Sequence, residues 1–213
     1  RVLFRSELID HIKKANFDKL DNIVNIKKSI EPGSEAYQDS GIPFIRVSNV
    51  TKFGISDTDI YLSRNILKEE ELQKLYPTKD TILLSKDGTV GIAYKIKNET
   101  EMITSGALLH LMIKRGDVLP EYLTLVLNSL IVQLQAQRDA GGSIIQHWKP
   151  SEIQEILIPI IDISVQKQIE EKIKKSFLLK EESKQLLDLA KKAVEIAIEE
   201  DENKAMEFIN AQI

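Results

Sequence analysis

Apolar and polar residues follow different patterns in two parts of the chain. Up to about residue 163, short apolar runs alternate with turns rich in Gly, Pro, Asp and Ser. Runs of this length are typical of strands and short helices. From Ser164 to about Glu202 there is neither Pro nor Gly, and helix-forming residues dominate. We therefore expect an α+β domain with a mixed sheet over residues 1–163 and a long helix within residues 164–213.

The apolar runs of the first part predict six strands, at residues 20–26, 42–50, 81–84, 90–96, 107–113 and 157–161. In the second run, Phe44, Arg46 and Ser48 alternate with Ile45 and Val47, which predicts one exposed and one buried face. Between the third and fourth runs, the dipeptide at residues 87–88 is Asp-Gly. This dipeptide accepts positive φ angles and predicts a hairpin. A proline at position 159 predicts an edge strand.

Three helices are expected in the same part of the chain. One follows Ser6 as its cap, with apolar residues at 8, 9 and 12, and a short acidic one spans residues 69–75. The third begins at Pro120, places apolar residues at helical spacing from 123 to 134, and ends near Gly141. A polar loop follows it, and we expect Trp148 of this loop to act as an anchor.

The C-terminal tail carries an apolar stripe. About 38 helical residues at about 1.5 Å each give a rod of about 55 Å. The stripe follows an approximate heptad, interrupted by polar residues at 176, 180 and 183, and consists of Ile169, Ile173, Leu187, Ala190 and Val194. A lone helix of this length cannot bury such a stripe against a small domain. The pattern therefore favours a partner helix over a solvated, frayed helix.

Composition narrows the setting and the possible ligands. The chain has 213 residues, 42% of them apolar, and no cysteine. It has no apolar run long enough for a membrane-spanning helix, so we expect a cytoplasmic protein. Its first residue is Arg1, which suggests a piece of a longer protein. The net charge of −4 excludes nucleic-acid binding through a general positive charge and requires basic residues to cluster on one face.

Four segments resemble those of a type I restriction–modification specificity subunit, in matching order over about 150 residues. They are Leu20-Asp21-Asn22-Ile23-Val24 with residues 26–28, Tyr37 with Gly41-Ile42-Pro43-Phe44-Ile45-Arg46-Val47-Ser48-Asn49-Val50, Lys79-Asp80-Thr81-Ile82-Leu83-Leu84 with Gly88 and Gly91, and Gly142-Ser143 through Gln146-His147, residues 156–159 and Gln166-Lys167-Gln168-Ile169. Two departures are Lys79, where the family usually has Gly, and Ile160-Ile161, which replace a second proline-rich turn.

The resemblance implies one target recognition domain followed by one spacer helix. In that family two recognition domains each bind one half of a split DNA site in the major groove, and two antiparallel helices set the distance between them. The implied partners are double-stranded DNA, a methyltransferase subunit, a restriction subunit, and either a second recognition domain or a second copy that pairs through the tail. S-adenosylmethionine is then bound by the methyltransferase, and this chain needs no cofactor.

Catalytic motifs are not found in the sequence. An amino-methyltransferase needs an Asn/Asp-Pro-Pro-aromatic loop and a glycine-rich cofactor turn, and neither is present. Asp80 and Asp87 are not followed by the acidic-x-Lys pair of a metal-dependent nuclease. Of the three histidines, we expect His110 in the core, His11 on a polar helix side and His147 in the loop, without ligands for a metal site. We expect neither catalysis nor a metal in this segment.

Two alternative functions stay open. The chain could be the C-terminal recognition domain of a single-chain adenine-specific DNA methyltransferase or methyltransferase–nuclease, in which case a Pro-Pro-Tyr-type motif would lie upstream. It could also be a coiled-coil assembly protein that does not bind DNA. That protein would show no salt-sensitive DNA affinity.

DNA-contacting residues are expected among polar loop side chains, since Arg, Lys, Asn, Gln, Ser and Thr match base edges and phosphates. Each also has a structural alternative, such as solvation of a strand end, an ion pair of Arg46 with Asp57 or Asp59, turn formation, or bonds to buried backbone. The expected residues are Lys27, Lys28 and Ser34; Arg46, Ser48, Asn49 and Lys52; Ser85, Lys86 and Thr89; and Ser143, Gln146, His147 and Lys149.

Overall fold

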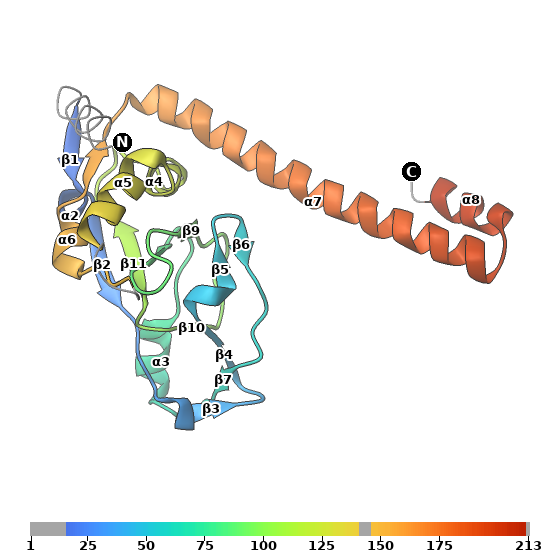
Figure 1. Ribbon diagram of the computed structural model, residues 1–213, viewed down its shortest axis with the longest axis horizontal. Coiled ribbons are helices and arrows are strands. Elements are labelled where there is room, and N and C mark those ends of the chain that lie inside the picture. Colours follow the sequence, from blue (N-terminus) through green and yellow to red (C-terminus); the bar gives the residue numbers. More distant parts are fainter. Residues whose placement is uncertain (1–15, 141–145, 212–213) are drawn as a thin grey trace. The chain divides into compact units, whose positions relative to one another are not determined.

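The computed structural model describes residues 16–140 and 146–211 (Figure 1). The chain divides into two compact units, with the boundary between Gln168 and Ile169. The first contains all strands of the described residues and several short helices, which confirms the expected α+β class. The helix predicted after Ser6 lies outside the described residues.

The largest core sheet is antiparallel, with the order β2-β11-β8-β9. Consecutive residues from Leu108 to Leu111 are all buried, so both faces of the sheet are covered. β8 and β9 form the expected hairpin, and Gly88 in their connection has a φ of 71°. The strands are β2 (Val24–Lys28), β11 (Leu108–Ile113), β8 (Ile82–Ser85) and β9 (Ala93–Lys95).

A second sheet has the order β10-β4-β7-β3, and its β10 and β4 are parallel. Its strands are β10 (Ile103–Thr104), β4 (Ile42–Ile45), β7 (Tyr61–Leu62) and β3 (Tyr37–Gln38). Two further antiparallel pairs complete the unit: β1 (Phe17–Lys19) with β12 (Leu157–Pro159), and β5 (Val50–Thr51) with β6 (Gly54–Ile55). Because most strands are short, much of this unit consists of loops.

Short helices and two hydrophobic clusters complete the first unit. One cluster joins β4, β7 and α3, and the other joins the end of β4 with β5, β8 and β11. The helix α3 (Glu69–Leu75) has the predicted bounds. The others are α2 (Leu20–Ile23), α4 (Pro120–Leu127), α5 (Leu130–Asp139), α6 (Pro150–Gln154) and the 3-10 turns Ser34–Ala36 and Val47–Asn49.

The bounds of all six predicted strands shift in the structure, and the strands predicted at 20–26 and 42–50 are partly replaced by helical turns. Leu20 to Ile23 form a helical turn, because the i,i+3 spacing of these two residues buries both on one side, and the strand begins only at Val24. The strand expected at 42–50 ends at Ile45. The alternation proposed for it is wrong at Phe44, which is fully buried in the core cluster.

The helix expected from Pro120 to Gly141 is interrupted at Asn128, and α5 starts two residues later. The side-chain amide of Asn128 pairs with both backbone groups of Ala93, donating to the carbonyl (2.8 Å) and accepting from the N–H (3.1 Å). This closes the free edge of β9. In the same way Gln135 of α5 pairs with both backbone groups of Leu157, which secures the last strand.

Gln166 fastens the first turn of the C-terminal helix α7 (Ile163–Glu199) to the first unit. Its side chain is fully buried. It accepts a hydrogen bond from the N–H of Leu119 (2.9 Å) and donates to the carbonyls of Asp117 and Ile161 (both 2.8 Å). All three backbone groups would lose their partner without this amide.

The cap of α7 is Asp162 and not Ser164 as predicted. The carboxylate of Asp162 accepts hydrogen bonds from the N–H (2.8 Å) and the hydroxyl of Ser164. The hydrogen bond from that hydroxyl is the main reason why the pKa of Asp162 is lowered. Ser164 lies inside the first turn.

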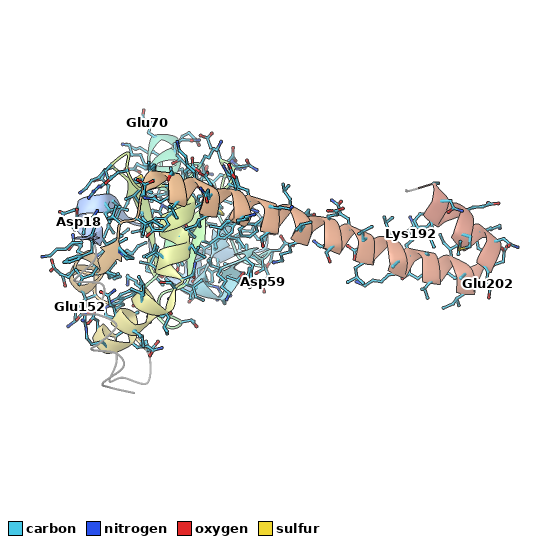
Figure 2. The ribbon with its side chains drawn as sticks, turned by 90° about the horizontal axis from the view of Figure 1, so that it is seen from above. Asp18, Asp59, Glu70, Glu152, Lys192 and Glu202 are labelled. Carbon is cyan, nitrogen blue, oxygen red and sulfur yellow. The ribbon has the colours of Figure 1, made fainter. Side chains whose placement is uncertain are left out.

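The second unit consists of the rest of α7 and a further helix, α8 (Glu202–Asn210), that the sequence pattern did not predict. Asp201 starts α8, since its carboxylate accepts from the N–H groups of Asn203 (2.8 Å) and Lys204 (3.0 Å). Ala193 and Ala205 are buried, and the ammonium of Lys192 lies 5.3 Å from the ring centroid of Phe208. Figure 2 labels Lys192 on α7 and Glu202 at the start of α8. None of the described helices is long and apolar enough to cross a membrane.

His110 links the two larger sheets through a buried hydrogen bond. Its Nε2 lies 2.8 Å from the hydroxyl of Thr104 on β10, and its side chain is buried in β11, as expected. Burial, followed by the positive charge of Lys27, lowers the pKa of His110 from 6.5 to about 4. A neutral imidazole is therefore part of the folded state at neutral pH.

We predict that this histidine makes the fold sensitive to mild acid. Between its unfolded pKa of 6.5 and its folded pKa of about 4, only the unfolded chain binds the proton. The contribution of neutral His110 to the free energy of unfolding is therefore complete above pH 6.5. It falls by up to about 3 kcal/mol as the pH approaches 4. Urea titrations of wild type and His110→Gln at several pH values measure this. An equal slope in wild type and His110→Gln would contradict the assignment.

Candidate nucleic-acid interface

Two loops that are distant in sequence are joined by backbone hydrogen bonds. The N–H of Gly88 donates to the carbonyl of Gln146 (2.9 Å), and the N–H of Trp148 donates to the carbonyl of Lys86 (2.7 Å). These bonds form an antiparallel bridge between Asp87 and His147. Trp148 is fully buried and anchors the second loop, as expected. The structure thus brings the third and fourth groups of predicted DNA-contacting residues together.

A carboxylate that was not among the predicted site residues organises this loop pair. Asp87 bonds Nδ1 of His147 through one oxygen and pairs with the ammonium of Lys86 through the other. The Lys86 side chain is 11% exposed, whereas that of His147 is 57% exposed. With Nδ1 committed to Asp87, the ring nitrogen left for a ligand is Nε2. In the sequence, Asp87 is explained by the Asp-Gly turn alone, so its contact with His147 could not be predicted.

Ser85 has a structural role, and the contact with DNA predicted for it is not supported. Its side chain is fully buried. The hydroxyl donates to the carbonyl of Thr89 (2.6 Å) and accepts from the N–H of Ile92 (2.9 Å), so that it closes the loop from within. Thr89 itself is exposed. In this loop pair, the side chains of Thr89, His147 and Lys149 are exposed, and those of Asp87 and Gln146 are partly exposed.

Lys149 lies at the end of the second loop, where α6 begins. Its side chain is 66% exposed, and its ammonium is 3.6 Å from the carboxylate of Glu152. Its backbone N–H donates to the same carboxylate (3.1 Å). Such an exposed ion pair contributes little stability and is easily exchanged for a phosphate. Ser143, predicted in this group, lies outside the described residues.

The second predicted group lies around the β5–β6 hairpin. Asn49 has its amide committed to backbone, since the oxygen accepts from the N–H of Arg46 (3.0 Å) and the nitrogen donates to the carbonyl of Asp57 (3.0 Å). Arg46, Ser48 and Lys52 are exposed. The ion pairs of the described residues do not include one between Arg46 and Asp57 or Asp59. Asn49 thus holds the loop that presents its neighbours.

The first predicted group, Lys27, Lys28 and Ser34, lies on β2 and in the turn before β3. The ammonium of Lys27 bonds the backbone carbonyl of Lys74, which gives this lysine a structural partner. Lys28 is exposed at the end of β2. Ser34 is exposed in the turn before β3, which Figure 1 shows at the bottom of the first unit, away from β5, β6 and β9. β2, whose end carries Lys28, is separated from β8 and its loop by β11.

The arrangement is suited to recognition by hydrogen bonds. Exposed hydroxyl, amide, imidazole and ammonium groups are presented by loops whose backbone is fixed on a sheet, which is the usual construction of a binding surface. Residues 16–140 and 146–211 contain no group of three or more His, Cys, Asp or Glu side chains that could hold a metal ion. Such a surface can serve the recognition of a polar ligand.

Comparison with known families gives the first unit its class. The model of the type I restriction modification DNA specificity domain matches residues 13–189, most of the chain. The chain therefore belongs to this family, as its motifs predicted, and sequence-specific DNA recognition is the function that defines the family. No protein with a curated description matches the sequence.

Solved structures of the same class share the fold. An S subunit of a type I restriction-modification system from M. genitalium matches with a TM-score of 0.57 and 16% identity, over 88% of this chain and 45% of that one. An HsdS subunit from Thermoanaerobacter tengcongensis matches with 0.52 and 16%, over 84% and 46%. The type IIG restriction endonuclease BpuSI matches with 0.55 and 16%, over 79% and 27%. The chain spans less than half the length of each of these proteins.

Proposed function

We propose that the chain recognises one half of a split DNA target and docks the methyltransferase and restriction subunits of a restriction–modification system. The observation that carries the proposal is the bridge between the loops at residues 86–88 and 146–148, within a DNA specificity domain. The bridge joins two loops that carry side chains able to match base edges. Recognition corresponds to residues 1–163 and pairing to residues 164–213.

The chemistry of the exposed loop groups fits the major groove. The amide of Gln146 can pair with adenine, and Nε2 of His147 can bond an exocyclic amine or a base acceptor. Thr89 can bond either base edges or phosphates, and Lys149 and Arg46 supply positive charge to the backbone. Because the net charge of the chain is −4, such local contacts must outweigh a general repulsion. The ligand is then DNA in the cytoplasm, and S-adenosylmethionine belongs to the methyltransferase partner.

The C-terminal helix is proposed to pair with a second such helix, from another recognition domain or a second copy of this chain. Leu187 and Val194 lie two turns apart on one face of α7 and are 57% and 58% exposed. Ala190 lies between them and is also exposed, whereas Ile169 and Ile173 are half-buried. Ala193, about 100° around the helix from Val194, is already buried. A partner helix would cover the stripe that stays exposed.

A second candidate function is recognition within a longer single-chain enzyme. The fold match to a type IIG restriction endonuclease, over 79% of this chain and 27% of that one, favours it. In this case the chain would be the C-terminal recognition domain of an adenine-specific DNA methyltransferase or methyltransferase–nuclease. A Pro-Pro-Tyr-type motif upstream in the full gene product would decide for this candidate, and a separate methyltransferase subunit would decide against it.

Methylation mapping and gel shifts with the cognate methyltransferase test DNA recognition. We predict that Gln146→Ala and His147→Ala each reduce discrimination between target and non-target DNA by about tenfold or more, because each removes a base contact, whereas Arg46→Ala weakens binding to both, because it removes a phosphate contact. Asp87→Asn should also reduce discrimination while non-target affinity stays equal or rises, since a negative charge is lost together with the orientation of His147.

Asp39→Asn is the matched control for that charge change. Asp39 is exposed beside β3, and its loss should leave discrimination unchanged. Thermal melting of each variant checks folding. Unchanged sequence preference in all loop variants would remove both candidate functions.

A paired substitution tests the helix stripe. We predict that Leu187→Asp together with Val194→Asp abolishes self-association of the chain in sedimentation experiments, because two charges would have to be buried in the helix contact. Leu178→Asp is the control, since Leu178 is 71% exposed and lies nine residues, about 180°, around α7 from Leu187. Association that survives in the double variant, or is lost in the control, would contradict the assignment of the stripe.

A further inference from the structure

A large aromatic side chain is exposed at the tip of the β5–β6 hairpin. The hairpin pairs Val50 with Ile55 and Thr51 with Gly54, and Lys52 and Phe53 form its turn. Phe53 is 54% exposed. The base of the hairpin is firmly rooted, because Val50 is buried and Ile55 packs against the same hydrophobic cluster. The exposed ring therefore belongs to an ordered element.

The turn itself is held by one hydroxyl. Thr51 Oγ1 donates to the carbonyl of Gly54 (3.0 Å) and accepts from the N–H of Phe53 (3.2 Å). Positive φ angles, which two-residue hairpins usually need, occur at neither Lys52 nor Phe53. The hydroxyl of Thr51 thus supports a turn that the backbone alone would favour less. The tip is preorganised to present Phe53.

A positive charge accompanies the ring. The ammonium of Lys52 lies 5.0 Å from the ring centroid of Phe53, within the range of a cation–π contact. The tip, residues 51–54, carries no carboxylate. At the foot of the hairpin, Arg46 and Ser48 are exposed, and so is the acidic Asp57. At the tip, a single exposed ring beside an ammonium group suits DNA better than it suits a protein interface, which needs a broad apolar patch.

The hairpin shares its support with the loop pair. Ile92, which follows the loop from residue 86 to 91, packs against the same cluster as Ile55. That cluster also contains Val50 of β5 and Leu83 of β8. The hairpin and the loop that carries Asp87 are thus supported by the same hydrophobic cluster.

We propose that the hairpin enters the major groove, where Phe53 packs against the 5-methyl group of a thymine and Lys52 contacts a neighbouring phosphate. A two-stranded ribbon fits this groove, and the thymine methyl is the apolar group on its base edges. This assignment deepens the proposed function and depends on it. It makes Phe53 a specificity-determining residue, one that the hydrogen-bonding residue types used to predict the site could not include.

The test uses the full gene product assembled with its methyltransferase and its mapped target duplex. Phe53→Ala should weaken binding to the target by about tenfold, leave non-target binding and the salt dependence unchanged, and leave the melting temperature unchanged. Lys52→Ala should weaken binding to both duplexes and reduce the salt slope by about one. Leu125→Ala, at an exposed leucine of α4, and Lys79→Ala are matched controls that should behave as wild type.

Replacing each thymine of the target by uracil identifies the contact. At one position the loss of the methyl should weaken wild-type binding but not weaken Phe53→Ala further. Losses that add to that of Phe53→Ala at every position would overturn the proposal, and so would a target without thymine. A Phe53→Ala defect that only a mismatched duplex relieves would also overturn it, because this is expected for a ring that wedges between stacked bases. A Phe53→Ala defect in methyltransferase assembly with normal DNA binding would assign the tip to a protein contact and overturn it as well. If wild type itself shows no sequence preference, the proposed function fails and this inference fails with it.

Discussion

The proposed recognition surface depends on two backbone hydrogen bonds between the loops at residues 86–88 and 146–148. Without them, the exposed side chains of Thr89 and His147 would belong to independent loops, and ordering both on DNA would cost conformational entropy. The buried indole of Trp148 anchors one side of the bridge, and the carboxylate of Asp87 fixes the imidazole on the other. A surface made in this way is ordered before its ligand arrives.

In the first unit, hydroxyl and amide side chains either bond backbone groups or reach solvent. The hydroxyls of Ser85 and Thr51 and the amides of Asn49, Gln135 and Gln166 bond backbone groups, whereas Thr89 and Gln146 reach solvent. The first set makes the short strands and turns rigid. Gln166 extends this rigidity to the start of α7, so that the first turn of the helix is part of the recognition unit. Position and support thus come from side chains that have no direct contact with a ligand.

Local signals were sufficient where structure is local. The Asp-Gly hairpin, the acidic helix α3 and the apolar strand β11 could be predicted from spacing and turn chemistry alone. The strand bounds at Leu20 and Arg46 could not, because burial and hydrogen bonds from distant segments decide them. The break before α8 was missed since Asp201 is a cap without Gly or Pro. For the candidate site, residue type selected polar loops but could not separate Ser85 and Asn49, whose polar groups bond backbone, from their exposed neighbours.

The central claim is that the two bridged loops contact one patch of the same duplex. Photo-cross-linking residues placed at Thr89 in one protein and at His147 in another test it directly, with the cross-linked bases mapped on the target DNA. The account predicts cross-links to the same or adjacent base pairs from both positions, and their loss on non-target DNA. Cross-links that lie a helical turn or more apart, or none from either position, would contradict it.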